Sequence, residues 1–134
     1  MTEIRKQPLP LDLASIPGVP CPCGTTHRGF VGEGPCSLHL VEISRDARAH
    51  YHRRLTEVYY FLEGEGHMEL DGKLHPVGPG SAAMILPGTL HRAVPGKGPM
   101  KVLNFVVPGF DPSDERFEVT PPPGEGSSAE VRRI

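Results

Sequence analysis

Residues 57–77 read EVYYFLEGEGHMELDGKLHPV, and this stretch decides the fold class. It opens with a largely apolar and aromatic run that ends at Gly64, which is typical of a β-strand. Two short β-rich segments, residues 66–70 and 73–77, then flank Asp71-Gly72. An Asp-Gly pair between two such segments is the strongest short-range signal of a β-hairpin. The stretch therefore predicts a strand followed by a hairpin.

Further short strands are expected on both sides of this stretch. They are predicted at residues 36–44, 47–53, 81–86, 91–94 and 101–107. Glycine and proline, at 16 residues each, supply turns between them, and the chain has no tryptophan and few helix-forming runs. Regularly spaced short strands with intervening turns indicate an all-β barrel or sandwich.

The length of 134 residues suits a single domain. Residues 1–35 are expected to form an N-terminal arm with room for edge strands, because their many prolines exclude a long helix. Residues 36–110 are expected to form the barrel. Residues 111–134 are expected to form a polar tail rich in proline, glycine and serine, with the linker-like composition of a mobile segment.

Charge and hydropathy exclude several classes of partner. The 14 basic and 16 acidic residues give a net charge of −2, so neither nucleic acid nor an anionic membrane surface is an expected partner. The apolar runs at residues 58–62 and 82–86 are too short to span a bilayer. No apolar stretch follows the charged N-terminus, so we expect no signal peptide and a cytoplasmic location. Three cysteines, an odd number, argue against a disulfide framework.

Histidines and one glutamate form the main candidate site. His50 and His52 are two residues apart and would point to the same face of a strand. Glu57 opens the next strand, and His91 follows a Pro-Gly turn. Three imidazoles and a carboxylate suit a divalent transition ion and leave positions open for water or substrate. A His-x-His pair also arises by chance on exposed strands, so the pair alone leaves a site without metal open. The other histidines of this region are expected to be surface or hydrogen-bonded residues: His39, His67 and His75.

The same residues carry a resemblance to a known family. The spacing of His50, His52, Glu57 and Gly64 resembles the first cupin motif, and that of Gly80, Gly88 and His91 resembles the second. Three positions depart from these motifs, and none is a ligand: Ser44 for glycine, Leu86 for proline and Pro95 for asparagine. The resemblance spans roughly residues 36–107 and implies a cupin jelly-roll β-barrel, usually a homodimer. It implies one metal ion, held by His50, His52, Glu57 and His91.

The leading functional hypothesis is a dioxygenase-like enzyme that acts on a small molecule. Fe²⁺ is the favoured ion, ahead of Mn²⁺, Ni²⁺ and Zn²⁺, because the carboxylate tilts an imidazole-rich site toward harder ions. Glu57 would serve as ligand and proton acceptor, and Tyr59, on the same strand face, would orient the substrate. Two alternatives remain open. One is a non-catalytic cupin that binds or senses a ligand, and the other is a metal-dependent lyase, isomerase or decarboxylase without redox chemistry.

Two further features are not explained by this site. Val58, Tyr60 and Leu62 would face away from the barrel interior, so they need cover from the arm or from a second subunit, which favours a homodimer. Cys21-Pro-Cys23 is a poor chelate, although with His27 and Cys36 it offers four zinc ligands. The alternatives are buried thiols, or a loop whose Arg28 reaches the mouth of the pocket to hold an anionic substrate.

Overall fold

The structure is a computed structural model, and it describes residues 10–117 of the chain. Within this range the protein is a single all-β domain, as predicted, with eleven strands and two one-turn 3-10 helices. The elements are η1 (Leu13–Ser15), β1 (Val19–Cys21), β2 (Gly24–Gly29), β3 (Ser37–Ile43), β4 (His50–Tyr51), β5 (Thr56–Glu63), β6 (Gly66–Leu70), β7 (Lys73–Val77), β8 (Ala82–Ile85), β9 (His91–Pro95), β10 (Met100–Val107), η2 (Pro112–Asp114) and β11 (Arg116–Phe117). No helix in this range is long and apolar enough to cross a membrane.

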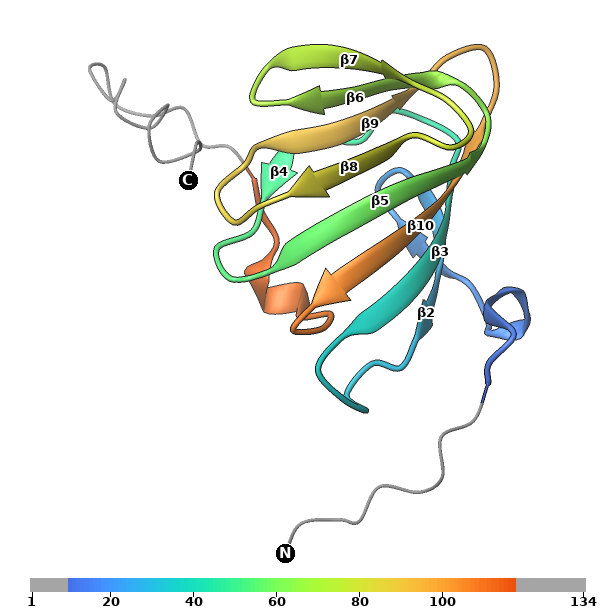
Figure 1. Cartoon of the computed structure of the whole chain (residues 1–134), viewed down its shortest axis with the longest axis vertical. Coiled ribbons are helices and arrows are strands. Elements are labelled where there is room, and N and C mark those ends of the chain that lie inside the picture. The colour runs from blue at the N-terminus through green and yellow to red at the C-terminus, as the bar shows by residue number, and fades with distance from the viewer. Residues whose placement is uncertain (1–9, 118–134) are drawn as a thin grey trace, which may run out of the picture.

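Two antiparallel sheets face each other and form a jelly-roll barrel (Figure 1). One sheet has the strand order β1-β2-β3-β10-β5-β8, and the other has the order β11-β4-β9-β6-β7. Several neighbouring strands come from distant parts of the sequence, for example β10, which lies between β3 and β5. The barrel is therefore held together mainly by non-local pairing.

The Asp71-Gly72 hairpin forms as predicted and also helps to place His91. Both turn residues have positive φ, 51° and 83°, as a type I′ turn requires. The amide of Asp71 donates to the carbonyl of Leu90 at 2.7 Å, and the Asp71 carboxylate accepts from the amide of Leu90 at 3.0 Å. This double link ties the hairpin to the residue that precedes His91.

The inward-facing side chains change from apolar to polar along the barrel. Toward one end, Phe61 of β5 pairs with Val102 of β10 across the sheet, and both are fully buried. Two residues along each strand, Tyr59 pairs with Asn104 in the same inward row. Because side chains alternate with period two, both pairs face inward, so the same strands present apolar side chains at one end of the barrel and polar ones at the other. The core cluster comprises Val41, Ile43, Phe61, Met68, Ile85, Ala93, Met100 and Val102.

Segments outside the expected barrel also contribute to it. From the expected N-terminal arm, β1 and β2 extend the larger sheet by pairing with β3. From the expected polar tail, β11 pairs with β4 in the smaller sheet. Residues 1–9 and 118–134, which include the stretch predicted to be mobile, lie outside the described residues.

Candidate metal centre

The three histidines singled out from the sequence converge at the polar end of the barrel. His50 lies in β4 and is the direct cross-strand partner of His91 at the start of β9. The predicted strand at residues 47–53 is shorter than expected, because β4 ends at Tyr51 and His52 follows it. One ring nitrogen from each histidine nevertheless lies within 4.8 Å of the other two.

Backbone carbonyls fix the orientation of all three imidazoles. Nδ1 of His50 bonds to the carbonyl of Arg48 at 3.3 Å, and Nδ1 of His52 bonds to that of Asp114 at 3.0 Å. Nδ1 of His91 bonds to the carbonyl of Thr89 at 2.9 Å. A carbonyl oxygen only accepts, so each Nδ1 carries a proton and donates it, which leaves Nε2 as the ring nitrogen available to the site. Metal-binding histidines are typically oriented in this way by their second nitrogen.

The Glu57 carboxylate lies against two of these rings. Its Oε1 is 3.3 Å from Nε2 of His91, and its Oε2 is 3.5 Å from Nε2 of His52. Asn104 donates from Nδ2 to Oε2 at 3.1 Å. Burial opposes ionisation of Glu57, but the adjacent imidazoles outweigh it and hold the pKa of this carboxyl well below its usual range. Glu57 therefore presents a carboxylate to the three-histidine group.

The pattern of unpartnered atoms fits a bound cation. In residues 10–117, six buried side-chain polar atoms have no hydrogen-bond partner, and all six belong to residues of this site. Three of them belong to residues whose side chains lie against one another: Nε2 of His52, Nε2 of His91 and Oε1 of Glu57. Leaving such atoms unsatisfied costs about 1–3 kcal/mol each. Burial and the neighbouring rings of His91 and His52 lower the pKa of His50 to about 4, so this ring is neutral at neutral pH. The donor set fits a divalent transition ion.

Two residues that sequence reasoning missed support this centre. The buried Asp114 carboxylate accepts from the amides of Arg53, Arg54 and Leu55, and its carbonyl accepts from His52. It thereby fixes the loop between His52 and Glu57, although its surrounding sequence resembled a linker. Asn104 did carry a signal, because it is a polar residue at an inward position of an apolar strand.

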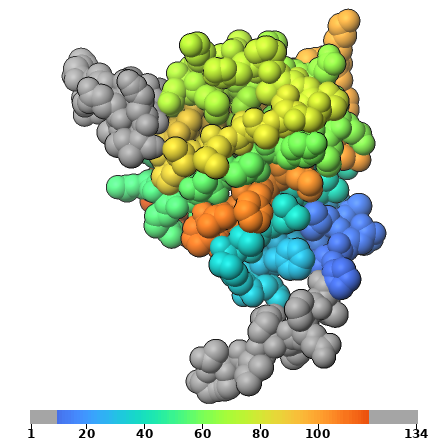
Figure 2. Space-filling model, viewed as in Figure 1, coloured from blue at the N-terminus to red at the C-terminus, as the bar shows by residue number. Residues whose placement is uncertain are grey.

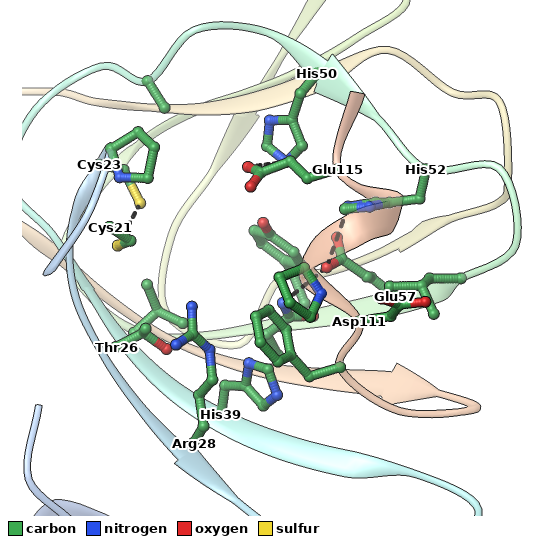
Figure 3. A pocket seen from close by; sticks show the side chains of 18 of the residues that line it. Cys21, Cys23, Thr26, Arg28, His39, His50, His52, Glu57, Asp111 and Glu115 are labelled. Carbon is green, nitrogen blue, oxygen red and sulfur yellow. Dashed lines mark hydrogen bonds and ion pairs between the residues drawn. The ribbon is translucent and has the colours of Figure 1, made fainter. Parts of the chain in front are cut away.

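A cavity of about 430 Å³ opens beside the histidines, a size suited to a small molecule. Figure 3 shows His52 and Glu57 on one side of it and Arg28 and Thr26 on another. Tyr59 also lines the cavity, and its hydroxyl makes no hydrogen bond to another of residues 10–117. Burial, and then the charge of Glu57, raise the pKa of Tyr59 well above its usual range, so this hydroxyl remains protonated.

The cysteines do not assemble the four-ligand zinc set considered above. All three are free, and the Sγ atoms of Cys21 and Cys23 lie 3.4 Å apart at the edge of the cavity. His27 instead bonds to the carbonyl of Ile16. Within the described part of the chain, the three-histidine group is the one cluster of at least three potential ligands.

The remaining histidines lie as expected from the sequence. His39 is buried and bonds through Nε2 to the hydroxyl of Ser37 at 2.9 Å. His67 and His75 are exposed on the β6–β7 hairpin.

Comparisons with known proteins agree with this architecture. The family model described as the cupin domain matches residues 37–106. A protein from Planctomyces limnophilus has a crystal structure that is 36% identical in sequence, with a TM-score of 0.76, and the match covers 83% of this chain and 97% of that one. No curated protein matches the sequence.

Two more distant structures share the fold alone. The Streptomyces nucleoside dehydratase Pac13 is 18% identical, with a TM-score of 0.73 over 84% of this chain and 92% of its own. A sugar phosphate isomerase of the cupin superfamily from Silicibacter pomeroyi is 24% identical, with a TM-score of 0.61 over 74% and 75% of the two chains. With both motifs in place, the family model over more than half of the sequence and a relative at 36% identity, the chain belongs to the cupin family.

Proposed function

We propose that this cupin is a metal-dependent enzyme that acts on a small polar molecule. One observation carries the proposal: three imidazoles, each anchored through Nδ1 to a backbone carbonyl, present Nε2 at the wall of a cavity. Such preorganisation is typical of a catalytic metal site, which keeps positions open for substrate.

In this proposal His50, His52 and His91 hold the ion, with Glu57 as the fourth ligand. When bound, the ion supplies an electrophilic centre that polarises substrate oxygen atoms. The chain's own groups handle protons around it. Tyr59, whose hydroxyl stays protonated, donates a hydrogen bond to the substrate. Glu115 lies at the cavity wall with Oε2 3.7 Å from Nε2 of His50, where its carboxylate accepts a proton.

This arrangement favours a lyase or isomerase that moves a proton without redox chemistry. The supporting observation is that a hydroxyl donor, Tyr59, and a carboxylate acceptor, Glu115, both line one cavity. A dioxygenase-like enzyme with iron is the second candidate. It is favoured by the donor set of three imidazoles and one carboxylate.

Deuterium exchange separates the two candidates. Small hydroxy and oxo acids are incubated with the metal-loaded protein in D₂O without oxygen, and incorporation is followed by NMR. The proton-transfer proposal predicts incorporation that falls at least about tenfold in Glu115→Gln, the expected contribution of a general base being roughly 10²–10⁴. Oxygen uptake by the iron-loaded protein, with no anaerobic exchange, would favour the dioxygenase. Saturable binding with neither reaction would contradict an enzyme and indicate a ligand-binding cupin.

A further inference from the structure

We propose that Arg28 and Thr26 of β2 form an anion-binding subsite, which holds a carboxylate or phosphate group of the ligand across the cavity from the metal-binding histidines. The inference deepens the proposed function and rests on it. It identifies the expected ligand as a small organic anion, with its anionic group at one end and a metal-binding oxygen at the other.

Strand register brings Arg28 into the cavity. Arg28 pairs with His39 of β3, His39 pairs with Asn104 of β10, and Asn104 pairs with Tyr59 of β5. These four residues therefore form one row across the larger sheet, and all four line the cavity. Thr26 lies two residues before Arg28 and lines the same cavity, as strand periodicity requires.

Arg28 is held in place and forms no close ion pair, although the charge of Glu115, which lines the same cavity, acts on it from a distance. Its Cζ lies 4.0 Å from the centre of the Phe110 ring, so the guanidinium is stacked on an aromatic face. No carboxylate in residues 10–117 forms an ion pair with it, and its Nε is buried without a hydrogen-bond acceptor. A stacked guanidinium keeps its N–H edge free, which is the edge that binds carboxylate or phosphate in a bidentate manner.

Thr26 adds a second donor that lacks a partner. Its hydroxyl is buried, with 3% of the residue exposed, and makes no hydrogen bond within the described chain. Native proteins rarely leave buried polar groups unsatisfied, so each such group requires an explanation such as an absent ligand. A hydroxyl and a guanidinium on adjacent inward positions together match the oxygens of one anionic group.

The unpartnered atoms of the cavity thus fall into two groups. One group surrounds the histidines, and the other comprises Thr26 Oγ1 and Arg28 Nε on β2. Figure 3 shows these groups on different sides of the cavity. His39, next to Arg28, has its pKa lowered to about 4 by burial and then by the Arg28 charge, so it is neutral at neutral pH. Arg28 therefore supplies the positive charge of this wall.

Calorimetric titration of the metal-loaded protein tests the subsite. The probes are acetate, which has one carboxylate, and malonate, succinate and glutarate, which add a second carboxylate at increasing distance. At least one dicarboxylate should bind about tenfold or more tightly than acetate, as expected for one charge-assisted contact. Arg28→Gln should abolish this gain while leaving metal content unchanged.

Further variants keep the test decisive. Lys73→Gln, on the exposed side of β7, removes one positive charge away from the cavity and should change nothing. Thr26→Val keeps the shape of the side chain and should reduce the gain by about two- to tenfold, so it replaces Arg28→Gln if that variant does not fold. Replacing succinate by 3-phosphonopropionate then shows whether the subsite prefers phosphate-like or carboxylate groups.

The outcomes separate the two proposals. Dicarboxylates that bind no better than acetate, or a gain that survives Arg28→Gln, would overturn the subsite. A protein that takes up no metal would overturn the proposed function, whereas succinate binding that still depends on Arg28 would sustain the subsite by itself.

Discussion

The two ends of the barrel interior are built from the same strands and differ in chemistry. At one end, Phe61 and Val102 are paired, buried and surrounded by other apolar side chains. At the other end, Tyr59 and Asn104 form the corresponding inward pair, and Glu57 follows Tyr59 in the same inward row. This site holds every unpartnered buried polar side-chain atom found in residues 10–117. The apolar end stabilises the fold, whereas the polar end keeps binding groups that are satisfied only when a ligand is present. Along one inward row, polar side chains replace apolar ones two residues further on, and this replacement divides the barrel interior.

The largest expected effect is at the apolar end. Phe61→Ala should lower the free energy of unfolding by about 3–5 kcal/mol, because it removes a fully buried aromatic side chain and leaves a cavity. Urea unfolding measures this, with His67→Ala on the exposed hairpin as control. Metal bound per folded chain should stay the same. Loss of metal from the folded fraction would show that the two ends are not separable.

A substitution of Asp114 tests whether this residue stabilises the polar end of the barrel. Asp114→Asn should lower the free energy of unfolding by about 2–3 kcal/mol, because a buried carboxylate that accepts three amides loses its charge and one acceptor. It should also weaken metal binding, since the loop between His52 and Glu57 loosens. Asp111→Asn, at the other end of η2, is the matched control with a smaller effect, because its pair with Arg54 is exposed. Equal effects of the two variants would contradict a special role for Asp114.

The outer face of the larger sheet carries exposed apolar side chains, and we predict that a second subunit covers them in a homodimer. Residues 10–117 leave an apolar surface uncovered on β5, β8 and β10, with Tyr60 45% exposed and Met84 62% exposed. Figure 2 shows these strands as adjacent bands on one face. Light scattering should give about twice the chain mass of 14.5 kDa, as expected for a symmetric dimer.

Met84→Glu should shift this dimer to the monomer. Leu74→Glu, at a residue 54% exposed on the other sheet, should remain a dimer. A monomeric wild-type protein would remove the argument for a second subunit on this face.

The smallest expected effect concerns the thiols at the edge of the cavity. Cys21, Cys23 and Cys36 are free, so thiol titration of the denatured protein without reductant should find three reactive groups. This result would agree with the reducing cytoplasm expected from the sequence. One reactive thiol would instead indicate a disulfide, for which the Sγ atoms of Cys21 and Cys23, 3.4 Å apart, are the nearest pair.

Local patterns in the sequence predicted most of the strands and the hairpin, because alternation and turn residues act over a few positions. The convergence of His50, His52 and His91 was also predicted, since strand periodicity and a family motif both describe it. Asp114 was missed because its role depends on hydrogen bonds to residues about sixty positions away. Arg28 was one of several open alternatives, and strand register, which composition does not reveal, places it in the cavity.

Elemental analysis of protein purified without a metal-affinity tag tests the central claim most directly. We predict one divalent metal ion per chain, and a metal affinity at least about tenfold weaker in His91→Ala, equivalent to about 1.4 kcal/mol or more, with His67→Ala unchanged. A wild-type protein that neither contains nor takes up a metal ion, or one whose metal binding survives His91→Ala, would contradict the account.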